Sequence, residues 1–243
     1  MIGLVLAAGA GRRLQPLTDA LPKTLLPVAG EATILDLALA NLRRAGLAEA
    51  VVVTGFASDR IAERVPTLQE RYGVAIRLIF NDRAEEWNNA YSLWLARETF
   101  GTGALLINGD TVHPAAVEEA VLAARGPDLL LAVDRVKPLG EEEMKIVLGV
   151  DARLARITKR IDPRTADGEY IGIALIEPAA AGPLADALEA TWRRDPSLYY
   201  EDGFQEMVDR GGAISVVSIG TVDWVEVDNH ADLSRAREIA CRY

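Results

Sequence analysis

The sequence predicts an α/β fold in which helices cover both faces of a mostly parallel, mixed sheet. The chain has 243 residues, half of them hydrophobic, which is enough to bury a full core. Its first half alternates short apolar runs, typical of buried strands, with amphipathic helical patterns. Strands that alternate with helices imply parallel pairing, because each connecting helix packs back onto the sheet.

The elements of the first half follow this alternation. Thr33 is a candidate N-cap for the first helix, with Asp36 three residues later, and Gly46 is a candidate stop. Pro66 is expected to interrupt or end the second helix. The predicted strands are 2–6, 50–54, 74–80 and 104–108, and the predicted helices are 33–45, 58–72 and 90–100.

The second half has more strands and fewer helices. Its predicted strands are 129–133, 143–150, 155–161, 169–176, 214–219 and 224–227, and its predicted helices are 178–193, 202–210 and 230–243. No stretch of the chain has the composition of a linker, so we expect residues 1–243 to form a single domain.

Charge and cysteine content narrow the function classes. The formal net charge is −10, so the chain as a whole repels nucleic acid and anionic membranes, and we expect neither as a partner. A phosphate site must then be a local basic pocket, for which Arg12, Arg13 and Lys23 are candidates. The single cysteine, Cys241, allows no internal disulfide and fits a reducing, cytoplasmic setting. No segment reaches membrane-spanning length, and an oligomer is compatible with the sequence.

Residues 6–27 form a loop that can wrap a triphosphate. Gly9 and Gly11 lack a β-carbon, so the backbone can approach phosphate oxygens and point its N–H groups at them. Arg13 can hold two phosphate oxygens, while Lys23, aimed by the preceding Pro22, supplies a point charge. The alternative is a glycine-rich connection followed by a solvated basic loop. A dinucleotide-binding motif is excluded, because Leu14 stands where a third small residue is required.

This segment resembles the signature of the nucleotidyltransferases that join a nucleoside triphosphate (NTP) to a phosphorylated sugar or alcohol. The match extends through Val28 and Gly30. The resemblance implies the Rossmann-like three-layer sandwich with a mostly parallel mixed sheet of the nucleotide-diphospho-sugar transferases. It also implies catalytic roles for Arg13 and Lys23. Nucleotide contacts are implied for Leu6, Ala7, Ala8, Gly9, Gly11 and Arg13.

Two acidic elements are candidates for a Mg²⁺ site. Asp110 follows an apolar strand, where ligands of parallel sheets bind, although Asn-Gly-Asp is also an ordinary turn sequence. In residues 224–228, alternation places Trp224, Glu226 and Asp228 on one face of a strand. A bound cation would explain the two neighbouring carboxylates, and a solvent-facing edge strand is the alternative. The resemblance implies that Asp110 and Asp228 bind Mg²⁺.

The sequence says less about the residues that bind the acceptor, which is the phosphorylated molecule that receives the nucleotidyl group. Lys159 resembles the family lysine that contacts the acceptor phosphate, with a plain surface lysine as the alternative. Lys145 invites the same interpretation, with a solvated charged turn as the alternative. Tyr200 and Trp224, together with the carboxylates Glu201 and Glu226, could hold a cationic head group, or the aromatics could simply pack under a loop.

Residues 81–95 bear on the nucleobase. The amides of Asn81, Asn88 and Asn89, with Ser92, could read a base edge, and helix capping is the alternative. This stretch resembles the bacterial phosphocholine, phosphonate and inositol-phosphate cytidylyltransferases rather than sugar nucleotidyltransferases. CTP is therefore the expected nucleotide.

The sequence thus predicts a Mg²⁺-dependent nucleotidyltransferase, with CTP and a small phosphorylated alcohol or phosphonate as substrates. We expect residues 1–128 to bind mainly the nucleotide and residues 129–243 mainly the acceptor. Two alternatives stay open: a sugar-1-phosphate nucleotidyltransferase that uses UTP, dTTP or GTP, and a catalytically silent regulatory subunit that senses nucleotides.

Overall fold

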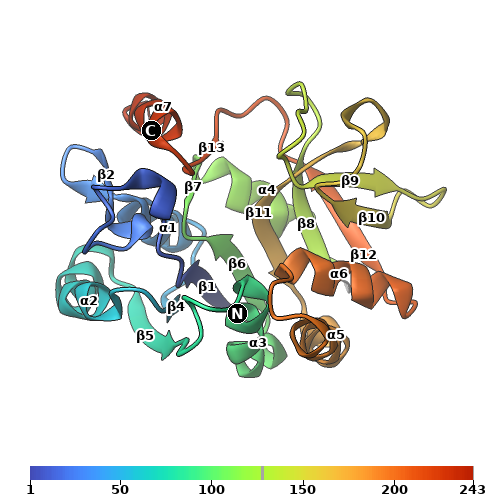
Figure 1. Cartoon of the computed structure of the whole chain (residues 1–243), viewed down its shortest axis with the longest axis horizontal. Helices are drawn as coiled ribbons and strands as arrows, with labels where there is room; N and C mark the ends of the chain where they lie inside the picture. Colours follow the sequence, from blue (N-terminus) through green and yellow to red (C-terminus); the bar gives the residue numbers. More distant parts are fainter. Residues whose placement is uncertain (127–128, 243) are drawn as a thin grey trace.

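The computed structural model describes residues 1–126 and 129–242. Its centre is a nine-stranded mixed sheet, ordered β10-β9-β11-β6-β1-β4-β5, in which β8 also pairs with β11 and carries β12 (Figure 1). Strands β11 and β10 run against the direction of the others. The strands are β1 (Ile2–Ala7), β4 (Glu49–Thr54), β5 (Ala75–Phe80), β6 (Ala104–Asn108), β8 (Leu129–Asp134), β9 (Lys145–Leu148), β10 (Leu154–Thr158), β11 (Gly168–Ile176) and β12 (Ile214–Ser218).

Helices cover both faces of the sheet, which confirms the predicted three layers. The α-helices are α1 (Ile34–Arg44), α2 (Ser58–Tyr72), α3 (Asn89–Leu95), α4 (Ala116–Ala123), α5 (Ala181–Arg194), α6 (Tyr200–Asp209) and α7 (His230–Ala240). Helices α1, α2 and α4 share one core with the sheet, and α3, α5 and α6 share the core on the other face. No helix among the described residues is long and apolar enough to cross a membrane.

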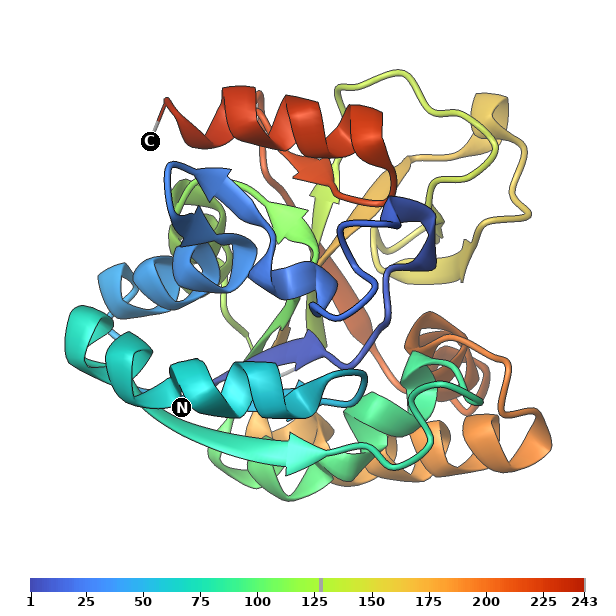
Figure 2. The ribbon, with the colours of Figure 1, turned by 60° about the vertical axis from the view of Figure 1, so that its left-hand side comes forward.

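Two small strand pairs lie outside the central sheet. They are β2 (Pro27–Ala29) with β3 (Ala32–Thr33), and β7 (Thr111–Val112) with β13 (Val225–Glu226). A third apolar cluster, which includes Leu14, Val112 and Leu233, packs α7 against these pairs. The rotated view shows α7 lying above the loop that follows β1 (Figure 2), and His230 Nε2 lies 3.0 Å from the carbonyl oxygen of Gln15.

Most boundaries lie close to the predicted ones, and local chemistry explains them. Thr33 caps α1 as predicted: its hydroxyl accepts from the Asp36 N–H, and the Asp36 carboxylate accepts from the Thr33 N–H. Helix α6 begins two residues earlier than predicted, which places Tyr200 and Glu201 in its first turn. Strand β13 is shorter than predicted, and the final helix ends at Ala240; residue 243 lies outside the described residues.

Two predictions about helices are corrected, and one helix was not predicted. Helix α2 continues through Pro66, because Pro66 and Ala62 both face solvent, so water can satisfy the carbonyl that loses its partner. The helix predicted over 90–100 ends at Leu95 and is followed by a 3₁₀ segment, Arg97–Thr102, in which the Thr99 hydroxyl donates to the Ala96 carbonyl. Helix α4 has no side-chain cap at its N-terminus, and the sequence pattern did not reveal it.

Candidate active site

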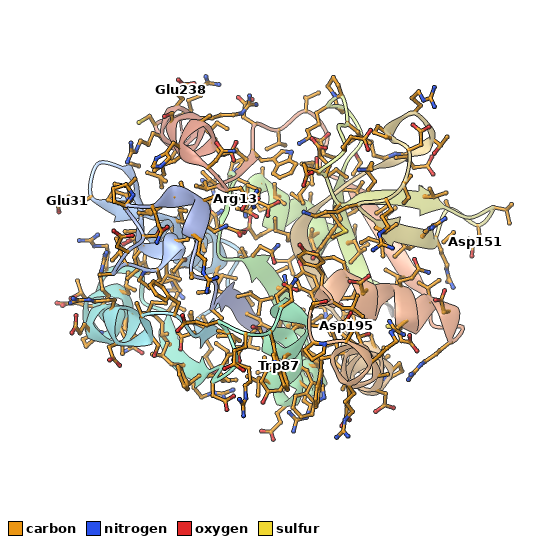
Figure 3. All side chains as sticks on the ribbon, in the orientation of Figure 1. Arg13, Glu31, Trp87, Asp151, Asp195 and Glu238 are labelled. Atoms are coloured by element: carbon orange, nitrogen blue, oxygen red, sulfur yellow. The ribbon has the colours of Figure 1, made fainter. Side chains whose placement is uncertain are left out.

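A cavity of about 250 Å³ opens at the carboxyl ends of β1 and β6. It lies beside the N-termini of α3 and α6, so residues far apart in the sequence meet around it. Its lining includes Leu6, Ala8, Gly9, Arg13, Asn88, Asn89, Ser92, Asn108, Asp110, Glu142, Met144, Lys159, Tyr170, Gly172, Tyr199, Glu201, Glu226 and Asp228. We call this cavity the central pocket; in Figure 3, Arg13 lies between α7 and the carboxyl ends of the strands.

The loop after β1 forms one wall of the central pocket. Gly9 has no atom within 4 Å of the position of a β-carbon, so its backbone faces open space. Gly11 adopts φ +61°, and a β-carbon there would lie 2.9 Å from the Lys23 β-carbon. A neighbouring cavity of about 100 Å³ is lined by Ala7, Gly11 and Lys23, together with Asp110. The residues of the glycine loop predicted to contact the nucleotide therefore all border these two adjoining cavities, whereas Arg12, the further basic candidate, borders neither of them.

Asp110, Glu226 and Asp228 form a carboxylate cluster beside the glycine loop. One oxygen of each lies within 4.8 Å of the others. Strands β7 and β13 bring them together, because Glu226 pairs with Thr111 and the Val227 N–H donates to the Asp110 carbonyl at 2.9 Å. Gly109 permits the turn: a β-carbon there would lie 2.4 Å from the Leu6 carbonyl oxygen.

Two cations already contact this cluster. Lys23 Nζ lies 2.7 Å from Asp110 Oδ2 and 3.0 Å from Asp228 Oδ1, and the lysine side chain is 12% exposed. Arg13 Nη2 lies 2.6 Å from Asp228 Oδ2. Burial by itself lowers the pKa of Lys23, but the charges of Asp110 and Asp228 outweigh it and raise that pKa above its ordinary value. Lys23 is therefore an ammonium ion at every physiological pH.

The pKa values of Asp228 and Glu226 are shifted in opposite directions. Burial raises the pKa of Asp228, but Lys23 and Arg13 reverse this effect and hold it below the usual range. Glu226 retains an exposed surface. Partial desolvation of its carboxyl group by the surrounding residues, together with the charges of Asp110 and Asp228, raises the pKa of Glu226 to about 8.

The donor set fits a hard divalent cation. Asp110 Oδ1 is buried and has no hydrogen-bond partner among the described residues, so its lone pairs are available to a cation. Carboxylate oxygens are the ligands that Mg²⁺ and Ca²⁺ prefer in proteins. Asp110, Asp228 and Glu226 are therefore the residues that could hold a metal ion.

The N-terminus of α3 supplies an amide-rich wall. Asn88 caps the helix, and its Nδ2 donates to the Ser197 carbonyl at 2.9 Å. Asn89 Oδ1 accepts from the Tyr200 N–H at 2.9 Å. The structure thus combines the two interpretations that the sequence left open, since Asn88 both caps α3 and borders the pocket. Asn81 is buried outside the wall, and its Nδ2 donates to the Ser92 hydroxyl at 2.8 Å.

Lys159 and Glu201 lie on the side formed by the second half of the chain. Lys159 Nζ stands 5.4 Å from the centre of the Tyr199 ring. Glu201 is only 6% exposed, and its Oε2 has no hydrogen-bond partner. Burial raises the pKa of Glu201 to about 7. A further cavity of about 380 Å³ continues from here and shares Met144, Lys159, Tyr199 and Glu201 with the central pocket.

Three predicted substrate contacts lie elsewhere. Lys145 is fully buried, and its Nζ donates to the carbonyls of Gly140, Glu141 and Glu143 at 2.8–3.1 Å, so neither the substrate contact nor the solvated turn fits. Tyr200 is also fully buried, with its ring in the core. Trp224 lies outside the central pocket, where its Nε1 donates to Asp134 at 2.7 Å and Lys137 Nζ lies 4.6 Å from its ring centre. It lines an adjoining cavity of about 640 Å³, which shares Arg13, Glu142, Lys159, Glu226 and Asp228 with the central pocket.

Several residues of the pocket wall were not predicted. Asn108 stands two residues before Asp110 and Tyr199 directly before Tyr200, and this proximity in the sequence was the available signal. Tyr170 and Gly172 lie on β11, which the sequence predicts as a strand but whose antiparallel insertion beside β6 it does not reveal. Glu142 and Met144 lie just before β9, in a segment fixed by Lys145.

Comparison with known proteins places this geometry in a family. A sequence model described as Nucleotidyl transferase matches residues 2–136, more than half of the chain. The chain is 36% identical to the choline-phosphate cytidylyltransferase of Streptococcus pneumoniae over 98 residues, which are 40% of each protein. It is 31% identical to the CMP-5'-(3-aminopropyl)phosphonate synthase of Streptomyces rubellomurinus, over 96% of this chain and 38% of that protein. A glucose-1-phosphate thymidylyltransferase of Streptomyces griseus is 28% identical over 96% of this chain and 64% of its own length. The chain therefore spans about 38–64% of the length of these three relatives.

Solved structures support the fold. The inositol-1-phosphate CTP transferase from T. maritima superposes with a TM-score of 0.81, over 98% of this chain and 96% of that one, at 22% identity. A UDP-glucose pyrophosphorylase superposes with a TM-score of 0.78, over 99% of this chain and 98% of that one, at 14% identity. At these identities the likeness shows the nucleotide-diphospho-sugar transferase fold and not the substrate. Since the family pattern covers more than half of the sequence and this fold surrounds the site, the chain belongs to the Nucleotidyl transferase family.

Proposed function

We propose that this protein transfers a cytidylyl group from CTP to a small phosphorylated alcohol or a phosphonate and releases pyrophosphate. One observation carries the proposal: the carboxylate cluster with Lys23 and Arg13 faces the glycine loop in the pocket that also contains Lys159. The site thus contains groups that can bind a polyphosphate, and it also contains the Lys159 ammonium group, which can bind the phosphate of a second substrate.

The proposed reaction is an in-line displacement at the α-phosphorus of the NTP. An oxygen of the acceptor phosphate forms the new bond to phosphorus, and the bond to the pyrophosphate oxygen breaks. The second pKa of a phosphate monoester is about 6, so the attacking oxygen is already anionic and needs no general base. Catalysis then depends on alignment and on charge stabilisation.

Residues of the pocket would provide both. Lys23 and Arg13, with the backbone of Gly9 and Gly11, would neutralise the triphosphate, and Lys159 would hold the acceptor phosphate. Asp110 and Asp228, with Glu226 beside them, would hold Mg²⁺. When bound there, the ion would supply positive charge where the two phosphates meet and reduce their repulsion.

Support for CTP comes from the amide wall and from the relatives. Asn88, Asn89 and Ser92 offer donors and acceptors of the kind that read a base edge, and Asn81 fixes the Ser92 hydroxyl. Two of the relatives named above are, by name, a cytidylyltransferase and a CMP-phosphonate synthase. We assign nucleotide binding mainly to residues 1–128 and acceptor binding mainly to residues 129–243, because the central pocket takes walls from both parts.

The acceptor side favours an acceptor with a positively charged head group. Glu201 presents a buried carboxyl oxygen without a partner, and Tyr170 and Tyr199 add aromatic surface to the same side. An ammonium group there would pair with Glu201 and favour its ionised form. The acidic side chain Glu142 lines the same pocket and adds to the attraction.

The test is pyrophosphate release with Mg²⁺, in which CTP, UTP, dTTP, GTP and ATP are each combined with phosphocholine, 2-aminoethylphosphonate, inositol phosphate and hexose 1-phosphates. Turnover with CTP and an alcohol-type acceptor is expected, and Asp110→Asn should abolish it. Arg44→Met is the matched control, because Arg44 pairs with Glu119 on the surface, outside the pocket.

Other results would support the alternatives. Turnover of a hexose 1-phosphate with another NTP would identify a sugar nucleotidyltransferase, which the match of 96% of this chain to part of a thymidylyltransferase keeps as the second candidate. Nucleotide binding without turnover of any acceptor would support a regulatory subunit.

A further inference from the structure

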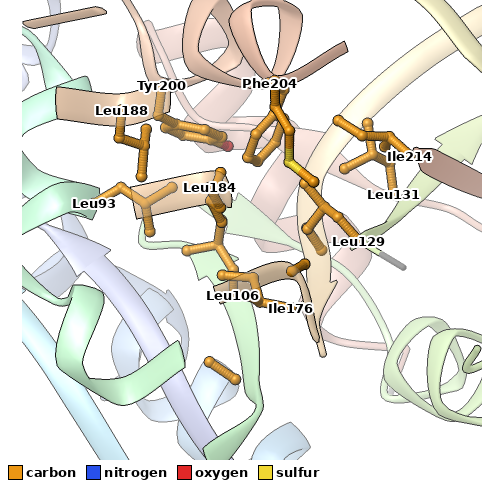
Figure 4. Packing of buried hydrophobic residues seen from close by; sticks show 14 of the residues in the cluster. Leu93, Leu106, Leu129, Leu131, Ile176, Leu184, Leu188, Tyr200, Phe204 and Ile214 are labelled. Carbon is orange, nitrogen blue, oxygen red and sulfur yellow. The ribbon is translucent and has the colours of Figure 1, made fainter. Parts of the chain in front are cut away.

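Tyr200 lies below the central pocket rather than in its wall. It sits in the first turn of α6, is fully buried, and packs its ring 5.2 Å from Phe204 and 6.2 Å from Tyr170, centre to centre. Figure 4 shows its ring among Leu188, Leu184 and Phe204. A phenylalanine would fill this space equally well, so packing does not explain the hydroxyl group.

The hydroxyl group of Tyr200 has a defined partner. It lies 2.9 Å from Asn108 Oδ1, and because an amide oxygen only accepts, Tyr200 must donate its single proton there. The Tyr170 hydroxyl lies 3.2 Å from the Tyr200 oxygen and must therefore be the donor of that second contact. Burial raises the pKa of both tyrosines, so both hydroxyl groups keep their protons. The chain of hydrogen bonds ends on Asn108.

Asn108 is the member of this chain that borders the central pocket. As the last residue of β6, it pairs with Leu6 of β1 on one side and lies beside Gly172 of β11 on the other. A β-carbon on Gly172 would stand 2.6 Å from Asn108 Nδ2, so only a glycine at this position lets the Asn108 carboxamide lie against β11. Asn108 therefore lies between the glycine loop and the acceptor side, with its oxygen held by Tyr200 and its side chain bordering the central pocket.

We propose that Tyr200 is a positioning residue that fixes the Asn108 carboxamide, so that Asn108 Nδ2 donates to an oxygen of the bound substrate. This inference rests on nucleotidyl transfer in the central pocket and adds a specificity-determining residue to it. The oxygen belongs either to the nucleotide or to the acceptor. Both sources offer the same chemistry, a hydroxyl or phosphoryl oxygen that accepts a hydrogen bond.

A double-mutant cycle tests the proposal. Asn108→Ala should weaken one substrate about 10- to 100-fold, the range for a hydrogen bond to a charged or buried oxygen. Tyr200→Phe should weaken the same substrate about 3- to 10-fold, because the amide stays but is free to rotate. In the Asn108→Ala background, Tyr200→Phe should have no further effect. Calorimetric affinity for CTP and the KM values for CTP and for the acceptor identify which substrate supplies the oxygen.

Phe204→Leu is the control for packing. It opens a cavity beside Tyr200 but removes no hydrogen bond, so Tm should fall while both KM values change less than about twofold. The positioning role would be overturned if Tyr200→Phe left both KM values and the CTP affinity unchanged. It would also be overturned if the fold-changes of Tyr200→Phe and Asn108→Ala multiplied in the double variant. Absence of wild-type turnover would instead refute the proposed function, so the two failures are distinguishable.

Discussion

Lys23 occupies the oxygens that a metal ion would use, and this predicts that its removal strengthens metal binding. Its Nζ lies 2.7 Å from Asp110 Oδ2 and 3.0 Å from Asp228 Oδ1, and Arg13 covers the other oxygen of Asp228. A divalent cation therefore meets carboxylates that are already paired. In Lys23→Met the apolar stem is largely kept and the charge is lost.

The magnitude follows from Coulomb's law. Charges of +1 and +2 about 5 Å apart repel by about 1.7 kcal/mol even in water, and by more in a cleft of lower dielectric constant. Because about 1.4 kcal/mol corresponds to a factor of ten, Lys23→Met should bind Mn²⁺ at least about tenfold more tightly than the wild type without nucleotide. Its turnover should nevertheless fall by roughly 10²–10³-fold, since a charge-stabilising donor is lost.

Electron paramagnetic resonance of free Mn²⁺ during a titration measures this affinity directly. Asp110→Asn should weaken binding and thereby locate the ion, and Arg44→Met should leave it unchanged, because the Arg44–Glu119 pair lies on the surface. If folded Lys23→Met bound Mn²⁺ no more tightly than the wild type, the competition between lysine and metal would be refuted.

Four further predictions concern individual residues. Burial raises the pKa of Glu201 from 4.5 to about 7, so the contribution of this group to stability is fully present below pH 4.5 and is lost as the pH rises to 7. The unfolding free energy of Glu201→Gln should therefore match that of the wild type at pH 4 and exceed it by up to about 3 kcal/mol at pH 8. A difference that denaturant titrations find to be the same at both pH values would contradict this. Lys145→Met should lower the unfolding free energy by roughly 2–4 kcal/mol in urea titrations, because three carbonyls lose a charged donor; unchanged stability with a raised acceptor KM would restore the substrate role. Gly9→Ala should leave Tm unchanged and lower the affinity for CTP measured by calorimetry, whereas Gly109→Ala should lower Tm, because its β-carbon would lie 2.4 Å from the Leu6 carbonyl oxygen. Equal Tm values for the two variants would contradict this geometry. Arg13→Ala should lower kcat/KM by about 10²–10³-fold, and a near-normal rate would remove Arg13 from the mechanism.

Local patterns in the sequence predicted the fold where the interactions are themselves local. The run 2–6 is apolar because β1 is covered by helices on both faces, and the capping residues of α1 lie three positions apart. By contrast, α3 ends early because a threonine hydroxyl and two glycines favour a 3₁₀ segment, and α2 tolerates Pro66 only because that side of the helix faces water. Where a helix ends, and whether it tolerates a proline, depends on which of its faces is buried in the fold. A single sequence does not show which face is buried.

The same distinction holds for the candidate site. Asp110, Glu226 and Asp228 could be proposed together because the chemistry of a metal site connects them across the sequence. Lys145 and Tyr200 have the residue types of substrate contacts, but their roles are set by partners that only the fold supplies: three carbonyl groups around the lysine and an asparagine from β6 beside the tyrosine. Residue type therefore predicted which chemistry is present, and packing decided which side chains are free to use it.

The pairing of β7 with β13 has a consequence for the order in which the protein is synthesised. Lys23 and Asp228 are 205 residues apart in the sequence, so the ribosome completes the glycine loop long before the carboxylates that neutralise Lys23. During most of translation, the loop would carry its positive charges without their partners. The cation site closes only when the segment before α7 pairs with β7, and nucleotide binding with a metal would therefore report that this segment has been synthesised and has paired with β7.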